Sequence, residues 1–273
     1  LLSESTIFKI AKHTIKFVPG NKKIAFAIGF TSLSPFFFKT PNVITKTTDA
    51  GLTWSIVDTV NTLINGHFYA LEVATENNIV ATFHDINNGP SVHYSTDGGS
   101  NWITNAIIGA DPTPPDFGIP PINLSITTWP MLKVAHKDTV FSTPDLTGAT
   151  WTAVTEPAWG VLNAIKFYDN NLGLAVGTKA VATYSSSVWY TSENDVNVTG
   201  SSVEWISDTE AILGTTNGIY KSTDHHHRHN RYFYVFGRAY AATGTGQRWY
   251  PDIHQPEGNG TCADIPAGSM AGL

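Results

Sequence analysis

One short motif recurs along this sequence at a constant interval and limits what the chain can fold into. Residues 47–54 read Thr-Thr-Asp-Ala-Gly-Leu-Thr-Trp, and residues 95–102 read Ser-Thr-Asp-Gly-Gly-Ser-Asn-Trp. A third copy at residues 142–151 contains two additional residues. The motif aspartates lie 48 positions apart in both intervals. A period of this length is typical of a repeat architecture, in which each repeat is one small supersecondary unit.

Each residue type in the motif suits a tight turn between two strands. Ser, Thr and Asp side chains hydrogen-bond to nearby backbone amides, and glycine supplies the positive φ that a short hairpin requires. The tryptophan packs the turn against the apolar layer beneath it. We therefore predict a structural role, and not a catalytic one, for nine motif residues. They are Asp49, Gly51, Trp54, Asp97, Gly99, Trp102, Asp145, Gly148 and Trp151.

The motif resembles the Asp-box, or BNR repeat, whose pattern is Ser/Thr-x-Asp-x-Gly-x-Thr-Trp. The first copy matches at every position, and the second departs only at Asn101. In sialidase-, sortilin- and xyloglucanase-like proteins such repeats form blades of a β-propeller, with the box between the third and fourth strands. The resemblance covers about residues 13–224. A further 48 positions lead to a degenerate copy at residues 189–195, and an early start of another copy follows at residues 220–224.

Strand patterns around the motifs favour the same fold. β-Branched and aromatic runs bounded by Asn, Gly, Asp and Pro precede each motif, such as residues 68–73 and 78–83, and a short run follows each one, such as residues 102–105. We predict an all-β fold, a β-propeller of four-stranded blades with Asp-box hairpins. The length of 273 residues allows five or six blades. Ring closure then requires a strand from the N-terminus, residues 6–10, or a partner chain.

The composition changes abruptly near residue 224. All lysines precede residue 222, whereas all arginines follow it, and histidines cluster at residues 225–229. We therefore divide the chain into a propeller, 1–224, and a compositionally distinct tail, 225–273. Three interpretations of the tail stay open, namely a terminal blade, an assembly segment, or a foreign or frame-shifted sequence. We interpret the histidine cluster as a tag or artefact, and we predict no metal site and no cofactor.

Charge and cysteine content exclude several classes of protein. The net charge of -6 and the pI of about 5.9 argue against nucleic acid or an anionic membrane as a partner. The single cysteine, Cys262, excludes a disulfide scaffold and a zinc site made of several thiolates. No uncharged apolar run reaches the roughly 18 residues of a transmembrane helix, so we predict no transmembrane segment.

Two enzyme classes carry Asp-boxes, and each needs particular catalytic residues. Sialidases bind a carboxylate with an arginine cluster, and residues 1–224 contain no arginine. Endoglucanases of the xyloglucan-cleaving type use two carboxylates across a cleft, as glycoside hydrolysis requires. The spacing of the acids outside the boxes pairs no two of them. We predict no catalytic residue and lean against an enzyme, with a glycoside hydrolase acting on polysaccharide as the alternative. The acids considered were Asp85, Asp111, Asp116, Glu156 and Asp169.

The most unusual loop lies between the second and third repeats. Residues 111–121 contain five prolines, which make a stiff, extended connection. Because loops on a rigid scaffold often carry function, we predict a ligand or partner surface there, together with two tryptophans that follow it. A blade spacer with core tryptophans is the alternative. The surface residues predicted are Asp116, Phe117, Trp129 and Trp159.

The leading function is a binding and scaffolding propeller without catalysis. The charged fraction of 14%, the single cysteine and the family resemblance suit a secreted or cell-surface protein whose ligand is a protein or a carbohydrate. A sharper form of the prediction is self-assembly into a homo-oligomer. An unclosed ring leaves sheet edges open to pairing, and the aromatic run at residues 232–236 suits donation of a strand to a neighbouring subunit.

Overall fold

The fold consists of five separate antiparallel sheets of four strands each. The computed structural model describes residues 10–31, 42–60, 66–85, 89–107, 122–147, 150–185, 187–191, 199–216, 218–223 and 232–236. In every sheet the strands are hydrogen-bonded in chain order, from an innermost first strand to an outermost fourth strand. We number the sheets 1 to 5 along the chain. The predicted all-β propeller of four-stranded blades is confirmed, and the described residues form five blades.

The strands of the first three sheets alternate with the repeated motifs. The motif turns connect the third strand to the fourth in each of these sheets. Sheet 1 contains β1 (Ile10–Val18), β2 (Asn21–Thr31), β3 (Asn42–Thr47) and β4 (Ser55–Val60). Sheet 2 contains β5 (His67–Val73), β6 (Ile79–Asp85), β7 (Gly89–Ser95) and β8 (Ile103–Ala106). Sheet 3 contains β9 (Ile122–Ile126), β10 (Leu132–His136), β11 (Thr139–Thr143) and β12 (Thr152–Thr155).

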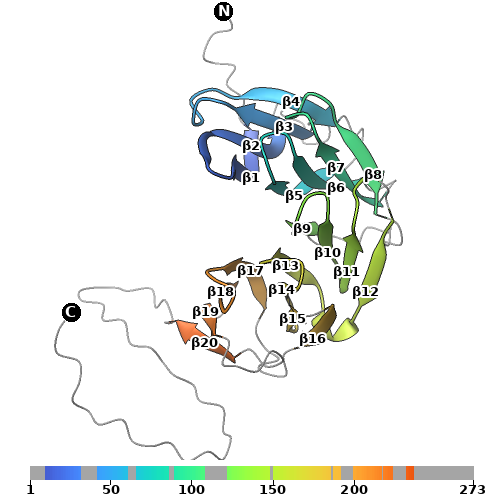
Figure 1. Cartoon of the computed structure of the whole chain (residues 1–273), viewed down its shortest axis with the longest axis vertical. Helices are drawn as coiled ribbons and strands as arrows, with labels where there is room; N and C mark the ends of the chain where they lie inside the picture. The colour runs from blue at the N-terminus through green and yellow to red at the C-terminus, as the bar shows by residue number, and fades with distance from the viewer. Residues whose placement is uncertain are drawn as a thin grey trace, which may run out of the picture.

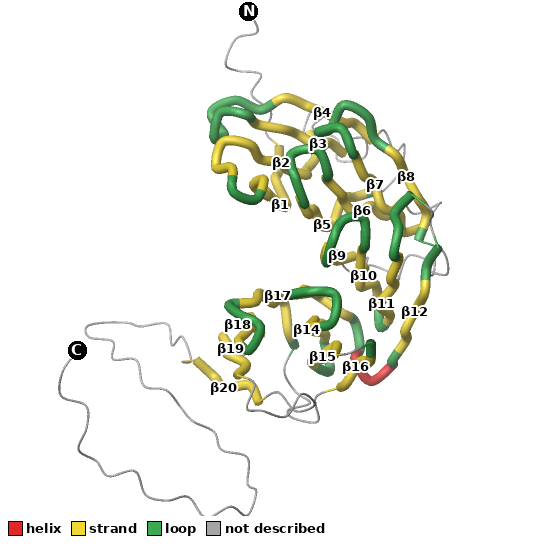
Figure 2. The backbone as a smooth tube through the Cα atoms, viewed as in Figure 1, coloured by secondary structure: helices red, strands yellow, loops and turns green. Residues whose placement is uncertain are grey.

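The last two sheets have the same order of strands. A short 3₁₀ helix, η2 (Pro157–Trp159), leads into sheet 4 and is the one helical segment in the described part of the chain (red in Figure 2). Sheet 4 contains β13 (Leu162–Phe167), β14 (Leu172–Gly177), β15 (Val181–Ser185) and β16 (Val188–Thr191). Sheet 5 contains β17 (Gly200–Trp205), β18 (Glu210–Thr215), β19 (Gly218–Thr223) and β20 (Tyr232–Phe236).

The five sheets follow one another around an arc (Figure 1). The innermost strands β1, β5, β9, β13 and β17 contact each other in that order. The arc ends at sheets 1 and 5, which do not meet in the view of Figure 1. Among the described residues no helix is long and apolar enough to cross a membrane.

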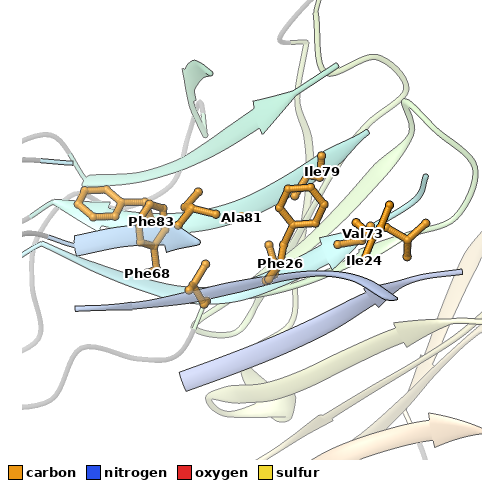
Figure 3. Packing of buried hydrophobic residues seen from close by; sticks show 11 residues of the cluster. Ile24, Phe26, Phe68, Val73, Ile79, Ala81 and Phe83 are labelled. Carbon is orange, nitrogen blue, oxygen red and sulfur yellow. The ribbon is translucent and has the colours of Figure 1, made fainter. Parts of the chain in front are cut away.

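The hydrophobic core lies between neighbouring sheets and not in the middle of the arc. Between sheets 1 and 2, Ile24 and Phe26 of β2 pack against Phe68, Val73 and side chains of β6 (Figure 3). Equivalent clusters fill the spaces between sheets 2 and 3, 3 and 4, and 4 and 5. Each sheet therefore buries both of its faces only when it has a neighbour on each side.

Two parts of the sequence fold differently from the expectation. The strand β9 was not predicted, because it emerges directly from the proline-rich loop without a turn signal of its own. The segment Tyr232–Phe236 pairs antiparallel with β19 as the fourth strand of sheet 5. This pairing uses the strand within its own chain, so it is not available for donation to a neighbouring subunit. The histidine cluster at residues 225–229 lies outside the described residues.

Candidate functional site

The first two motif turns share one hydrogen-bonding pattern. In the first, the Asp49 carboxylate accepts from the Thr47 hydroxyl at 2.8 Å and from the Thr53 amide at 2.8 Å. The Gly51 amide donates to Thr47 Oγ1, and Trp54 Nε1 donates to the Gly51 carbonyl at 3.1 Å. Every donor to the aspartate lies within its own turn, so the carboxylate holds the turn closed.

The second turn repeats this pattern with a substitution. Asn101 replaces the threonine, and its amide nitrogens donate to both carboxylate oxygens of Asp97 at 2.9 and 2.6 Å. Ser95 donates to the same carboxylate at 2.8 Å, and Trp102 Nε1 donates to the Gly99 carbonyl at 3.2 Å. An Asn side chain therefore takes the place of a Thr hydroxyl without loss of the carboxylate contacts.

Hydrogen bonding makes both motif carboxylates unusually acidic. The Thr53 hydroxyl, followed by its amide and the Thr47 hydroxyl, lowers the pKa of Asp49 to about 2. The Asn101 side chain, followed by its backbone amide and the Ser95 hydroxyl, lowers the pKa of Asp97 to about 2. Hydrogen bonds to the charged form favour that form. A carboxylate of this kind is poorly suited to act as a general acid at neutral pH.

The third turn departs from the other two. Its Thr143 hydroxyl donates to the backbone carbonyl of Asp145 instead of the carboxylate, and Thr147 binds the carboxylate through its hydroxyl and amide. Trp151 packs against the core between sheets 2 and 3, but its Nε1 has no hydrogen-bond acceptor among the described residues. The two additional residues change the path of the turn, and Gly148 lies outside the described residues.

The degenerate fourth copy is a wrong assignment. Residues Trp189 and Tyr190 lie within β16, the outermost strand of sheet 4, and not in the turn before it. That turn is much shorter, because Ser185 pairs directly with Val188 and Ser187 adopts a positive φ of 73°. The constant period of 48 therefore breaks down after the third sheet, where a two-residue connection replaces the motif.

The four residues of the predicted ligand surface do not lie together on an exposed surface in the described part of the chain. Asp116 and Phe117 lie outside the described residues. Trp159 is only 2% exposed, donates its Nε1 to Thr191 Oγ1 at 2.8 Å and packs edge-on against Trp189. This burial contradicts its placement on a surface and supports the alternative of a core tryptophan. Trp129 is partly buried against the core between sheets 2 and 3, near the Tyr94 ring.

A charged cluster at the centre of the arc was missed by the sequence analysis. Glu72 of β5 accepts from Lys16 of β1 at 3.2 Å and from Lys166 of β13 at 3.0 Å, both on the same oxygen, Oε1. Lys166 Nζ also lies 4.0 Å from Glu204 Oε2 of β17. We name these four residues the axial cluster. It joins the innermost strands of four different sheets.

The register explains why these residues meet. The four residues occupy equivalent positions on the innermost strands, because their partners occupy equivalent positions on the second strands. The pairs are Lys16 with Phe26, Glu72 with Val80, Lys166 with Leu174 and Glu204 with Ile212. In sheet 3 this position is Ser125, whose hydroxyl accepts from the Phe167 amide at 2.9 Å. Because serine is short, Lys166 reaches past sheet 3 to Glu72. No sequence spacing within one repeat could have shown this contact.

The axial cluster brings two carboxylates close together. Glu72 Oε1 and Glu204 Oε2 both lie within 4.0 Å of one lysine nitrogen, so their separation is below the upper limit of about 9.5 Å in inverting glycosidases. The lysine stands between them, however, and a second lysine binds the same oxygen of Glu72. Two ammonium groups therefore already occupy the oxygen of Glu72 that faces Lys166 and Glu204.

Buried histidines form the other group of titratable side chains. His93 of β7 packs edge-on against the Phe68 and Phe83 rings, and burial lowers its pKa to about 4. His84 and His136 are buried in adjacent sheets with ring centroids 6.1 Å apart. Within the described ranges, no group of three or more His, Cys, Asp or Glu residues is arranged to hold a metal ion.

Similar solved structures are β-propellers. The structure titled YCF48 bound to D1 peptide aligns at 16% identity and a TM-score of 0.55, over 79% of this chain and 66% of that chain. The WD40 repeats of RRP9 align at 10% identity and 0.55, over 82% and 80%. An α-L-arabinofuranosidase from Fusarium graminearum, in complex with an iminosugar inhibitor, aligns at 11% and 0.51, over 74% and 70%.

At these identities the likeness shows the fold alone. The chain spans about two thirds of the YCF48 chain. No protein-family model and no curated protein sequence matches it. The β-propeller fold is therefore established, whereas membership of the Asp-box family stays a prediction that rests on the motif residues.

Proposed function

We propose that this chain is a non-catalytic binding and scaffolding β-propeller that acts outside the cell or at the cell surface, and that its ligand binds at the axial cluster. The observation that carries the proposal is the convergence of two lysines and two glutamates on one axis from four rigid strands. Their side chains retain access to solvent, with Glu72 17% and Glu204 68% exposed.

The chemistry of the cluster fits a ligand with both donors and acceptors. Ammonium groups of Lys16 and Lys166 bind carbonyl or carboxylate oxygens, and Glu204 accepts from amides, hydroxyls or ammonium groups. Peptides and sugars both present such groups. Since YCF48 was solved with a peptide bound, peptides are the ligand class to test first. Because the lysine side chains are long, they can turn from their ion-pair partners toward a ligand.

The test measures binding of the full chain to a peptide array and a glycan array. We expect a class of ligands whose binding falls at least tenfold in the double variant Lys16→Glu, Lys166→Glu. The matched control is the double variant Lys22→Glu, Lys179→Glu, the same charge change on two exposed residues outside the cluster. Ligands that bind the double variant as tightly as the parent would contradict the axial placement. Cell fractionation tests the extracellular location separately.

A glycoside hydrolase is the second candidate, and the separation of Glu72 and Glu204 favours it. The position of Lys166 between them opposes it. Hydrolysis of any member of a polysaccharide panel, abolished by Glu72→Gln and by Glu204→Gln, would establish this candidate in place of the first. Substitution of Lys179 again serves as the control.

The fold limits the ways in which copies of this chain could form a homo-oligomer. Donation of the strand Tyr232–Phe236 to another subunit conflicts with its pairing to β19. The remaining route is through the two end faces of the arc, and light scattering of the full chain over a range of concentrations tests it.

A further inference from the structure

The register defines which residues face the next sheet. In sheet 1, Phe26 pairs with Lys46, and Ile44 lies two residues before Lys46. Cross-strand partners share a face, and this face packs against sheet 2, where Phe26 and Ile44 are both 0% exposed. We name this side of each sheet its forward face and the opposite side its rear face.

Sheet 5 has equivalent residues in the same register, but no described sheet lies beside this face. Ile212 pairs with Lys221, and Ile219 lies two residues before Lys221. Ile212 is 39% exposed and Ile219 is 54% exposed. The corresponding residues of sheet 2, Val80 and Val92, are fully buried like those of sheet 1. Two core positions are therefore left open at the end of the arc.

At the other end of the arc, sheet 1 also exposes apolar residues whose equivalents in other sheets are buried. Phe17 and Ile15 lie on the rear face of sheet 1, paired with Ala25 and Ala27. Phe17 is 52% exposed, whereas the residues in the same register of sheets 2 and 4, Val73 and Phe167, are buried. Both ends of the arc therefore present the surface of a sheet interface.

Sheet 5 also carries charged residues at the positions that make polar contacts between sheets 1 and 2. Between sheets 1 and 2, Lys46 Nζ donates to the Gly98 carbonyl in the motif turn of sheet 2 at 3.0 Å, and Lys16 pairs with Glu72. Lys221 and Glu204 occupy the positions of Lys46 and Lys16 on sheet 5. A neighbour that supplies a turn carbonyl and a basic side chain would complete both contacts.

The axial cluster limits the size of any element that could cover the two end faces of the arc. Sheets 1 and 4 place Lys16 and Lys166 on the same oxygen of Glu72, so the arc already turns around a narrow axis. Figure 2 shows sheets 1 and 5 at the two ends of the arc, where they do not meet. A second arc of five sheets would bring five more innermost strands to the same axis. The occupant is therefore smaller than a second arc.

We propose that the forward face of sheet 5 and the rear face of sheet 1 are docking sites for one further four-stranded blade of the repeat from which this chain is built. The blade covers Ile212 and Ile219 with apolar side chains of its rear face. It also offers a turn carbonyl to Lys221 and a basic side chain to Glu204. This inference does not depend on which ligand the axial cluster binds.

The experiment extends the full chain by a copy of residues 66–107, the blade of sheet 2, through a linker of about 20 Gly and Ser residues. This copy carries the rear face that packs against Phe26 and Ile44 in the parent. Docking is expected to raise Tm by about 5–10 °C, to halve the fluorescence of a dye that binds exposed apolar surface, and to slow amide exchange in β18 and β19 at least threefold. The matched control carries Leu71→Lys and Val73→Lys within the copy only.

Two results would overturn the proposal. The first is a fused copy whose Tm, dye binding and amide exchange equal those of the lysine control. The second is a parent chain that is a stable dimer by light scattering and becomes monomeric on substitution Ile219→Lys, because the occupant would then be a second copy. A second measurement guards against a copy that does not fold. In the full chain alone we expect a monomer in which Ile219→Lys shifts Tm by less than about 2 °C, as surface substitutions do.

Discussion

Sheets 1 and 5 are built alike and differ in what lies beside them. Ile44 and Ile219 are the same residue type at the same position, as are Lys46 and Lys221. One isoleucine is completely buried by sheet 2, whereas the other is half exposed at the end of the arc. Lys46 donates to the next sheet, but Lys221 turns to Glu210 of its own sheet. Burial is therefore a property of the position in the arc and not of the repeat.

The largest effect is expected where this comparison is made directly. Ile44→Ala removes buried methyl groups between sheets 1 and 2 and should lower the free energy of unfolding by about 2–5 kcal/mol. Ile219→Ala makes the same chemical change on the end face and should lower it by no more than about 0.5 kcal/mol. Urea denaturation of both variants measures the difference. Equal losses would mean that sheet 5 is covered in solution.

A second prediction concerns the desolvated interface between sheets 1 and 2. Burial lowers the pKa of His93 to about 4, from an ordinary value of 6.5. The unfolded chain therefore binds more protons between these values, and the folded state loses up to about 3 kcal/mol as the pH falls from 6.5 to 4. Below pH 4 this group contributes no further loss. Urea midpoints of the parent and of His93→Phe across this range measure it, and parallel pH profiles would contradict the prediction.

The axial cluster offers a third comparison, between its two carboxylates. Glu72→Gln leaves Lys16 and Lys166 without their shared partner and should lower the free energy of unfolding by about 1–2 kcal/mol, an effect that diminishes at high salt. Glu204→Gln removes a longer and more exposed contact and should cost less than about 0.5 kcal/mol. Thermal unfolding at low and high salt measures both. Identical losses would place Glu204 in a contact that sheet 5 shares with another blade.

The smallest effect is expected at the exposed motif turns. Hydrogen bonds lower the pKa values of Asp49 and Asp97 from 3.8 to about 2, so their stabilisation is complete above pH 4 and is lost as the pH falls toward 2. The double variant Asp49→Asn, Asp97→Asn should have a flatter stability profile between pH 4 and 2. This window lies below that of His93, so one acid titration separates the two contributions. An unchanged slope in the double variant would contradict the role of the turns.

Much of the fold could be predicted because its signals are local. Motif residues such as Thr47, Asp49 and Thr53 hydrogen-bond to each other within eight positions, so the sequence of the motif is enough to predict the turn. Strand runs such as residues 78–83 and 102–105 were recognisable from residue type and overlap β6 and β8. The predicted motif copy at residues 189–195 was wrong, because it was placed by the 48-residue period alone. The turn before β16 has only two residues and needs no motif.

The candidate site could not be predicted, since its members come from separate repeats. Lys16 and Lys166 are distant in sequence from Glu72, and each lies in an ordinary strand pattern. Only the register of each sheet and the curvature of the arc bring them to one oxygen. Trp159 shows the opposite error, because an aromatic residue after a loop suits a binding surface as well as a core until its surroundings are known.

The sequence by itself determined the blade, through short-range hydrogen bonds in the motif turns and the alternation of apolar residues along each strand. The tertiary structure decided which faces are covered, which charges meet and at which sheets the described arc ends. The physical reason is that a sheet carries two apolar faces whatever its neighbours are, whereas burial and ion pairing depend on what lies across them. Ile44 and Ile219 show this with one residue type in two places.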